Sequence, residues 1–365
     1  MYYIYHIAFL FSVIFSMAYK PNRISQKAIT RELKLKKNTV FAILSFFPIF
    51  LISGIRYGVG SDYFDYALSF QQIISNSTGK WTVGINDIGY VYLCKFIGLF
   101  SSEPSSFFLV TSFLSIGILF IAIYEQSSKP WMSILIYFFI TYYYFNFTLV
   151  RNMLGISIFV YATKYIREKK LIPYITFCLI AASIHNTLLI TIPVYFLFNV
   201  KLEEKILKYL GAVLALLAVV RPFMGKLIVY IASNTRYGLY YFKEYYDGST
   251  DYIWLFVHLI ILIVLYSVWR KVEVENKDNL GLLMQFITVV IALYSQFIPL
   301  AFRVMFVFAV PQIITIPNAI NNIKNKSSRK TYTVIICAFF FVLYLLIAYV
   351  KQWNTVIPYK TIFGL

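Results

Sequence analysis

The chain has 365 residues, of which 60% are hydrophobic and 20% aromatic, while only 13% are charged. Its mean hydropathy of +0.72 argues against a soluble domain, because no soluble domain of this length needs so much apolar surface. The net charge of +18 comes largely from basic residues in short loops between apolar runs, a pattern that marks membrane orientation and argues against nucleic acid as a partner.

Apolar runs recur along the whole sequence, without the roughly ten-residue alternating segments of a transmembrane β-barrel. We therefore expect an all-α polytopic membrane protein with about 12 spanning or re-entrant helices. The two runs beside His185 are shorter than the roughly twenty residues of a straight crossing, so they are either tilted or a re-entrant pair. The expected spans are residues 2–19, 39–55, 105–124, 131–149, 152–166, 171–184, 186–199, 207–221, 251–269, 280–298, 301–320 and 331–350.

The distribution of basic residues orients these spans. Segment 20–37 holds seven basic residues, so we expect it to be a cytoplasmic loop, with Met1 outside. The run before it lacks a basic leader and a small-residue cleavage site, and we expect it to remain as the first span. Residues 1–365 are predicted to form a single transmembrane domain in the inner or plasma membrane, with outer segments 56–104 and 221–251.

The two outer segments carry most of the candidate sugar-binding side chains. Within the first, Tyr63–Ser75 is predicted to form a short amphipathic helix, and the second is rich in tyrosine. Tyrosine at a membrane boundary often belongs only to an interfacial belt, but aromatic faces beside acids and amides also suit sugar rings. The candidates are Tyr57, Tyr63, Asp65, Tyr66, Arg236, Tyr237 and Tyr240.

Five arginines lie at or near the predicted outer ends of spans, namely Arg56, Arg151, Arg221, Arg236 and Arg303, and the first, second and last of these are the candidates for a shared site. If these residues only set the membrane orientation, lysine would be energetically less costly, because its flexible stem readily carries the charge to the water interface. Arginine is preferred where a planar fork must grip a phosphate or carboxylate. Any one of the three can be a structural residue that bonds backbone carbonyls. Taken together, they predict a site for an anionic head group, with a lipid diphosphate as the obvious candidate.

The candidate catalytic residues are His185 and Asp62. A lone histidine in a helix is more often a satisfied core residue, but His185 is predicted on the same side as the arginines, and its ordinary pKa of about 6.5 suits a general base. Asp62 and Asp65 are three residues apart and would share a helix face. Such a pair can serve as acid and base, bind a divalent cation, or simply neutralise Arg56 and the outer arginines.

Several familiar motifs are missing from the sequence. The glycines at 58 and 60 lack the third glycine of a dinucleotide loop and the Gly-Lys-Ser/Thr of a P-loop. Neither a Gly-x-Ser-x-Gly elbow nor a His-Glu-x-x-His motif occurs. The absence of Asp-x-Asp weakens the case for a metal-dependent nucleotide-sugar transferase. We expect neither a metal nor a cofactor.

The stretch GIRYGVGSDY at residues 54–63, placed after the second predicted span, resembles the hallmark of EpsG-type membrane proteins, a branch of the Wzy-like polysaccharide polymerases. Supporting elements follow in that family's order: RNMLGI at 151–156, IHNT at 184–187 followed by Pro193, Arg303 in a late span, and IPYKTIF at 357–363. Two departures are Ser61, where threonine is most often expected, and Asn186, where an aromatic residue is common.

The resemblance implies a glycosyltransferase that polymerises polyprenyl-diphosphate-linked oligosaccharide repeat units, such as those on undecaprenyl diphosphate, on the outer face of the membrane. The product would be a capsule, exopolysaccharide or O-antigen. The fold would be similar to the multi-helix (GT-C-like) glycosyltransferases that use lipid-linked sugars without a metal. The implied partners are the lipid-linked oligosaccharide, membrane lipid, and a chain-length regulator and flippase of the same pathway. In this scheme Arg56, Arg151 and Arg303 hold the diphosphate, and His185 or Asp62 is the base.

Two other classes of protein remain open. A flippase or transporter of lipid-linked sugars would also need a cationic cavity, but its two halves should show matched broken helices, and no such pairing is visible here. A membrane acyltransferase would also use a buried histidine, and only the residues around His185 argue against that class.

Overall fold

The computed structural model describes residues 3–19, 28–75, 87–197, 200, 202–235, 238, 240–241, 252–347 and 356–364, with the backbone alone for 28–37. Its described residues are mainly helical, and their one isolated β-bridge joins Arg56 to Thr361. The helices are α1 (Tyr3–Ala18), α2 (Ala28–Gly54), α3 (Tyr63–Ser75), α4 (Ile88–Gly98), α5 (Pro104–Gln126), α6 (Pro130–Phe139), α7 (Tyr142–Thr148), α8 (Val150–Arg167), α9 (Leu171–Ile184), η1 (Asn186–Thr191), α10 (Val194–Leu197), α11 (Glu204–Val219), α12 (Arg221–Ser233), α13 (Tyr252–Trp269), η3 (Val274–Asn276), α14 (Asn279–Leu293), η4 (Ser295–Phe297), α15 (Phe302–Ala309), α16 (Gln312–Asn321) and α17 (Lys326–Leu345).

The structure does not confirm twelve spans. In the described part of the chain, four helical segments are long and apolar enough to cross a membrane, namely Pro104–Gln126, Tyr252–Trp269, Phe302–Asn321 and Lys326–Leu345. The pair α11 and α12 would add a fifth, but it is bent by 73°. The other apolar helices have 10–17 residues, which is short for a straight crossing. Repeated apolar helices of this kind indicate a membrane-embedded protein.

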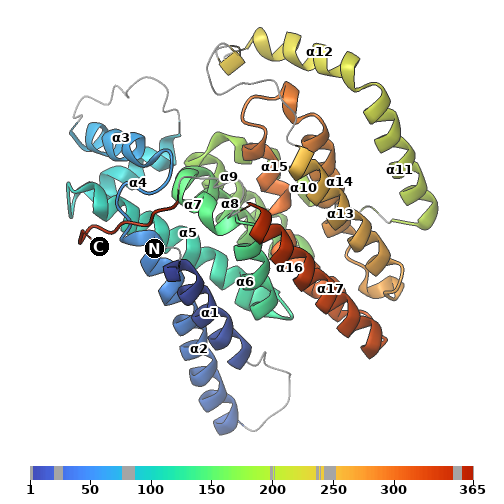
Figure 1. The fold of residues 1–365 in the computed structure, drawn as a ribbon, viewed down its shortest axis with the longest axis horizontal. Coiled ribbons are helices and arrows are strands. Elements are labelled where there is room, and N and C mark those ends of the chain that lie inside the picture. Colours follow the sequence, from blue (N-terminus) through green and yellow to red (C-terminus); the bar gives the residue numbers. More distant parts are fainter. Residues whose placement is uncertain are drawn as a thin grey trace.

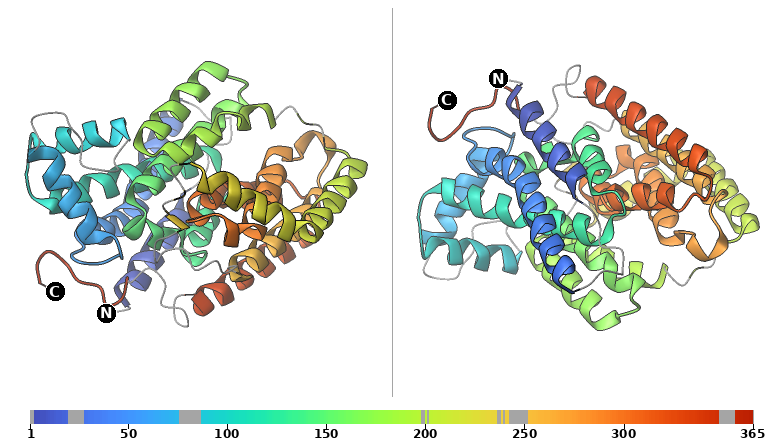
Figure 2. Two further views of the ribbon diagram at one scale, coloured as in Figure 1. Left: turned by 90° about the horizontal axis from the view of Figure 1, so that it is seen from above. Right: turned by 90° about the horizontal axis from the view of Figure 1, so that it is seen from below.

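Two packed groups of helices meet at the centre of the molecule (Figure 1). In the first, α1 packs on α2, α2 on α5, α5 on α8, and α8 on α9. In the second, α14 contacts both α13 and α15, while α16 and α17 both contact α6. The two ends of the described chain lie side by side, as the views from above and below also show (Figure 2). This proximity brings α1 against the last residues of the chain.

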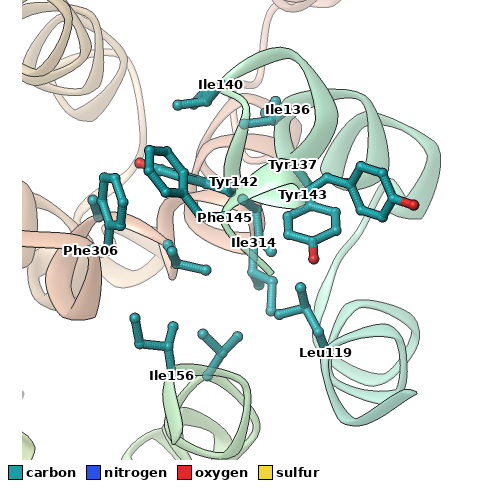
Figure 3. Packing of buried hydrophobic residues seen from close by; sticks show 14 of the residues in the cluster. Leu119, Ile136, Tyr137, Ile140, Tyr142, Tyr143, Phe145, Ile156, Phe306 and Ile314 are labelled. Carbon is teal, nitrogen blue, oxygen red and sulfur yellow. The ribbon is translucent and has the colours of Figure 1, made fainter. Parts of the chain in front are cut away.

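One expected span, residues 131–149, is broken in the structure. Helix α6 ends at Phe139, and α7 starts at Tyr142, because Thr141 between them has a left-handed backbone with φ 66°. The break turns the aromatic residues of α7 into the interior, where Tyr142 and Phe145 pack against Phe306 of α15 (Figure 3). These residues form part of the central core, which also includes Ile156 and Ile314.

The predicted amphipathic helix Tyr63–Ser75 is confirmed as α3, with the same bounds. Its buried residues are Tyr63, Ala67, Phe70 and Ile73, which repeat every three or four positions and therefore form one face. This face joins residues of α4 and α5 in a second, smaller core. That core fixes α3 and α4 relative to α5.

Helices occupy part of the expected basic loop 20–37 and part of the expected outer segment 221–251. Helix α2 begins at Ala28, so residues 28–37 of the expected basic loop belong to a helix. The expected outer segment 221–251 likewise begins with the thirteen-residue helix α12. Pro222, at the second position of α12, is tolerated there because the first turn of a helix has no internal partner for its backbone N–H.

Candidate functional site

A cavity of about 180 Å³ lies between α3, α4, α8 and α15. It contains five of the residues that the sequence analysis singled out, and Ser69 and Tyr90 complete its lining. The five are Asp62, Asp65, Tyr66, Arg151 and Arg303. Residues that are up to 241 positions apart in the sequence therefore face one space that combines guanidinium groups, carboxylates and phenols.

Arg151 reaches the cavity from the first turn of α8. Its Nη1 donates to Oδ2 of Asp87 at 3.0 Å, forming an ion pair. Its guanidinium carbon lies 5.0 Å from the centre of the Tyr90 ring and 5.9 Å from that of Tyr66, within the range of cation–π attraction. The Nε atom is buried and has no hydrogen-bond partner. The ion pair with Asp87 therefore fixes the orientation of the Arg151 guanidinium, while its Nε has no hydrogen-bond acceptor among the described residues.

Asp87 was missed by the sequence analysis. It precedes α4 in the position of a helix cap, but its side chain makes no capping hydrogen bond. Oδ2 instead pairs with Arg151, and Oδ1 accepts from the backbone N–H of Asn186 at 3.1 Å. The buried carboxylate therefore ties Arg151 to the turn that follows His185. In the sequence, Asp87 stands directly before an apolar helix. That position is typical of a helix-capping residue and does not by itself indicate a partner for Arg151.

Asn152, next to Arg151, was also missed. Its side-chain Nδ2 donates to Oγ1 of Thr187 at 3.2 Å and to the backbone oxygen of Arg303 at 3.3 Å. The side chain is buried, so these bonds fix the backbone of Arg303 relative to α8 and to the turn after α9. Through Arg151 and Asn152, the first turn of α8 therefore connects three segments around the cavity: the start of α4, the turn after α9 and the start of α15.

Arg303 is the second residue of α15. It follows Leu300, whose backbone is left-handed with φ 54°, and Ala301. Its Nε is buried without a hydrogen-bond partner, and within the described part of the chain no carboxylate lies within ion-pair distance of it. Arg303 is therefore the cation at the cavity whose charge is left without an acidic partner among the described residues.

Asp62 and Asp65 lie at the entry to α3. Oδ1 of Asp62 accepts from the Ser61 hydroxyl at 2.7 Å, and its backbone oxygen accepts from the N–H of Tyr66 at 3.0 Å. Neither carboxylate forms an ion pair with a described basic residue. Neither carboxylate therefore pairs directly with Arg56. Both share the cavity with Arg151 and Arg303, so the alternative that they neutralise the outer arginines stays a prediction.

Arg56 does not join the other two arginines at the cavity. Its side chain is completely buried, with the guanidinium directed back at the end of α2. It donates to the backbone oxygen of Ser53 and, at 3.3 Å, to the hydroxyl of Ser112. Burial lowers the pKa of Arg56 to about 10, so it stays charged at neutral pH. The predicted three-arginine cluster is thus reduced to Arg151 and Arg303 in the structure.

His185 lies in the connection between α9 and η1, beside the cavity but outside its lining. Its Nδ1 is 3.4 Å from Oγ1 of Thr187. Burial, and then the positive charges of Arg151 and Arg303, hold the pKa of His185 well below its ordinary value. The imidazole is therefore neutral at physiological pH, and the same burial and charges make it a weaker base than an ordinary histidine.

The candidate tyrosines fall into different environments. Tyr66 lines the cavity, whereas Tyr63 is buried, with its ring stacked 4.1 Å from that of Phe108, and is therefore a packing residue. Tyr57 is half-exposed and Tyr240 partly buried, and neither lines the cavity. Arg236 and Tyr237 lie outside the described residues.

No metal-binding cluster is visible among the described residues, since nowhere do three histidine, cysteine or acidic side chains converge. The functional groups that the cavity does offer are guanidinium, carboxylate, hydroxyl and phenol. These groups suit a ligand with phosphate and hydroxyl groups, in which guanidinium forks bind the phosphates and carboxylates accept from the hydroxyls.

The model of the EpsG family matches residues 39–361, a range that includes every residue lining the cavity. The comparisons with curated proteins and with solved structures give no significant match. Because the family match covers most of the chain and the whole cavity, we conclude that this protein belongs to the EpsG family.

Proposed function

We propose that the protein is a polysaccharide polymerase that joins polyprenyl-diphosphate-linked oligosaccharide repeat units. The observation that carries this proposal is the cavity itself, where Arg151 and Arg303 face Asp62 and Asp65. Membership of the EpsG family supports the general role of a polymerase. The chemistry of the cavity supports a substrate with both anionic and hydroxyl groups.

The two arginines would bind the diphosphate of the donor. Both side chains line the cavity, where a bound diphosphate would meet their guanidinium groups. A guanidinium fork binds phosphate oxygens in pairs, and fixed cations stabilise the negative charge that develops on the departing lipid diphosphate. Arg303 would contribute most, because its charge has no acidic partner in the described part of the chain.

Glycosyl transfer also needs a base. The acceptor hydroxyl oxygen attacks the anomeric carbon, the bond from that carbon to the diphosphate oxygen breaks, and the hydroxyl proton moves to the base. Asp62 is our first candidate because its carboxylate lines the cavity without an ion-pair partner. His185 is the second candidate, because it is neutral and lies beside the cavity, although it is outside the lining and its lowered pKa makes it a weaker base.

The sugar rings would contact the remaining polar and aromatic residues. Tyr66 offers a ring face, and Asp65 accepts hydrogen bonds from sugar hydroxyls at the same cavity. Tyr57, Arg236, Tyr237 and Tyr240 stay predictions for sugar contacts beyond the cavity. The reaction is proposed to proceed at the outer face of the membrane and without a metal, so full activity in excess EDTA is expected.

An assay with the purified protein in liposomes tests this proposal. The substrate is a fluorescent oligosaccharide linked to polyprenyl diphosphate, and the products are separated by length. A ladder of longer chains supports the polymerase. Relocation of the substrate across the bilayer without new glycosidic bonds would point to a flippase, and product formation that depends on an acyl donor would point to an acyltransferase.

A further inference from the structure

The C-terminal end of α2 is completed by residues from outside the helix. The last carbonyls of a helix lack internal partners, and cations near this end are stabilised by the helix dipole. Here the backbone oxygen of Ile52 accepts from the Tyr359 hydroxyl at 2.9 Å, across 307 positions of sequence. The backbone oxygen of Ser53 accepts from the Arg56 guanidinium. These bonds pair the two carbonyl oxygens, whereas Nε and Nη2 of the Arg56 guanidinium are buried without a hydrogen-bond partner among the described residues.

The segment Val356–Gly364 continues from this contact along the loop that follows α2. The backbone N–H of Tyr57 donates to the oxygen of Lys360 at 2.9 Å, and the N–H of Ile362 donates to the oxygen of Ile55 at 2.9 Å. The Tyr5 hydroxyl of α1 donates to the backbone oxygen of Val356 at 2.7 Å. The segment is thus held at both ends, by α1 and by the loop.

The same loop leads directly to the cavity. Gly60 has a left-handed backbone with φ 102°, and a Cβ at this position would lie 2.3 Å from the backbone oxygen of Phe147. The loop therefore passes against the end of α7 with no room for a side chain. Two residues later, Asp62 lines the cavity. The position of its carboxylate depends on how the loop is held.

Arg56 is at the centre of this arrangement. Its guanidinium carbon lies 4.6 Å from the ring centre of Phe108 and 4.9 Å from that of Phe147. Thr361 pairs with it through the β-bridge. The side chain joins α2, α5 and α7, and it is fully buried. These contacts are those of a residue that holds the loop, since a ligand in the cavity would not touch it.

We propose that Arg56 and the segment Tyr359–Ile362 are positioning elements that hold the loop of residues 55–62 and so present Asp62 to the cavity. The effect on catalysis rests on the proposed polymerase function. In this role Arg56 acts through the loop and does not bind the diphosphate. Lysine can also bond the last carbonyls of a helix, so Arg56→Lys should retain much of the activity, whereas Arg303→Lys should not.

The hydroxyl of Tyr359 gives the sharpest test. Tyr359→Phe removes only the bond to Ile52, and Ile362→Pro removes the N–H that bonds Ile55. Tyr92→Phe is the control, because the Tyr92 side chain is 64% exposed. With the full-length protein in liposomes, both test variants should lower kcat about tenfold with little change in KM, because a displaced carboxylate slows the chemical step more than binding. Tyr92→Phe should match the wild type.

A second readout is independent of activity. A nitroxide label on Ser61→Cys, in a Cys337→Ser background, reports the mobility of the loop, since the other two cysteines are buried. Tyr359→Phe and Ile362→Pro should each make the label more mobile. Unchanged label spectra in both variants, or an equal loss of activity in Arg56→Lys and Arg303→Lys, would overturn the inference. If the wild type makes no polymer, the proposed function fails, but mobilised labels would still support the loop contact.

Discussion

Asp87 shows how a single side chain can set the geometry of this cavity. One carboxylate oxygen pairs with Arg151, and the other accepts from the turn after His185. Charge-assisted hydrogen bonds of this kind are directional as well as strong. The diphosphate-binding orientation of Arg151 should therefore depend on the negative charge of Asp87.

Asp87→Asn should lower kcat about tenfold, which corresponds to about 1.4 kcal/mol. The amide oxygen can still accept from Asn186, so folding should be largely preserved while the charge that orients Arg151 is lost. Initial rates in the liposome assay measure this change. Glu125→Gln, which breaks the exposed pair with Lys164 away from the cavity, is the matched control and should change kcat less than twofold. A wild-type kcat in Asp87→Asn would contradict the assigned role.

The lowered pKa of His185 predicts a pH dependence of stability. In the unfolded chain a histidine takes up its proton near its ordinary pKa of about 6.5, whereas folded His185 does so only at lower pH. Its contribution to the free energy of unfolding is therefore complete above about pH 6.5 and is lost as the pH falls below that value. The loss amounts to at most about 2 kcal/mol by pH 5. Thermal unfolding in detergent at pH 7.5 and 5.0 should show a smaller loss of Tm for His185→Gln than for the wild type. Equal losses would show that His185 is not held neutral.

At the level of residues, the sequence predicted much of the cavity and missed what orients it. Charged and phenolic residues beside apolar runs are easy to recognise in a sequence. This pattern identified five of the lining residues, namely Arg151, Arg303, Asp62, Asp65 and Tyr66. The direction of a side chain does not follow from its place in the chain, so the sequence could not show that Arg56 and Tyr63 lie outside the cavity lining. Asp87 and Asn152 act through single hydrogen bonds across the fold, and spacing carries no signal for these.

At the level of elements, the loop between α2 and α3 depends on close backbone contact. Gly60→Ala should lower the free energy of unfolding by about 2 kcal/mol or more, because the added Cβ meets the backbone oxygen of Phe147 and φ is unfavourable for alanine. Gly211→Ala in α11 is the control, since a Cβ there meets nothing within 4 Å, and it should be neutral or stabilise by up to about 1 kcal/mol. Thermal unfolding in detergent compares the two. Equal effects would show that the contact at Gly60 is unimportant.

Element prediction succeeded where a local pattern decides the structure. Helix α3 and helix α9 have the predicted bounds. In α3 the apolar residues are periodic, whereas α9 is a continuous apolar run bounded by Lys170 and His185. The break between α6 and α7 was missed, because no glycine or proline marks Thr141 and the left-handed turn is stabilised by packing of the aromatic residues around it. The strand-like contact of Thr361 with Arg56 also requires the folded molecule.

For the whole molecule, the positive-inside pattern predicts which face carries the cavity. Ser61→Cys should react with a membrane-impermeant maleimide added to intact cells, because Ser61 is exposed beside Asp62. Lys326→Cys, at the start of α17 among basic residues, should react only after the cells are permeabilised. Both variants are made in a Cys337→Ser background. Labelling of both positions in intact cells would contradict the predicted orientation.

The most direct test of the account is polymer formation by Arg303→Lys. The purified wild type, Arg303→Lys and Arg270→Lys are compared in liposomes with a polyprenyl-diphosphate-linked oligosaccharide. Arg270 is the control because its side chain is 59% exposed. The wild type and Arg270→Lys should give the same ladder, and Arg303→Lys should lose about a hundredfold in kcat/KM, because lysine keeps the charge but loses the fork. A full wild-type ladder from Arg303→Lys would contradict the proposed diphosphate site.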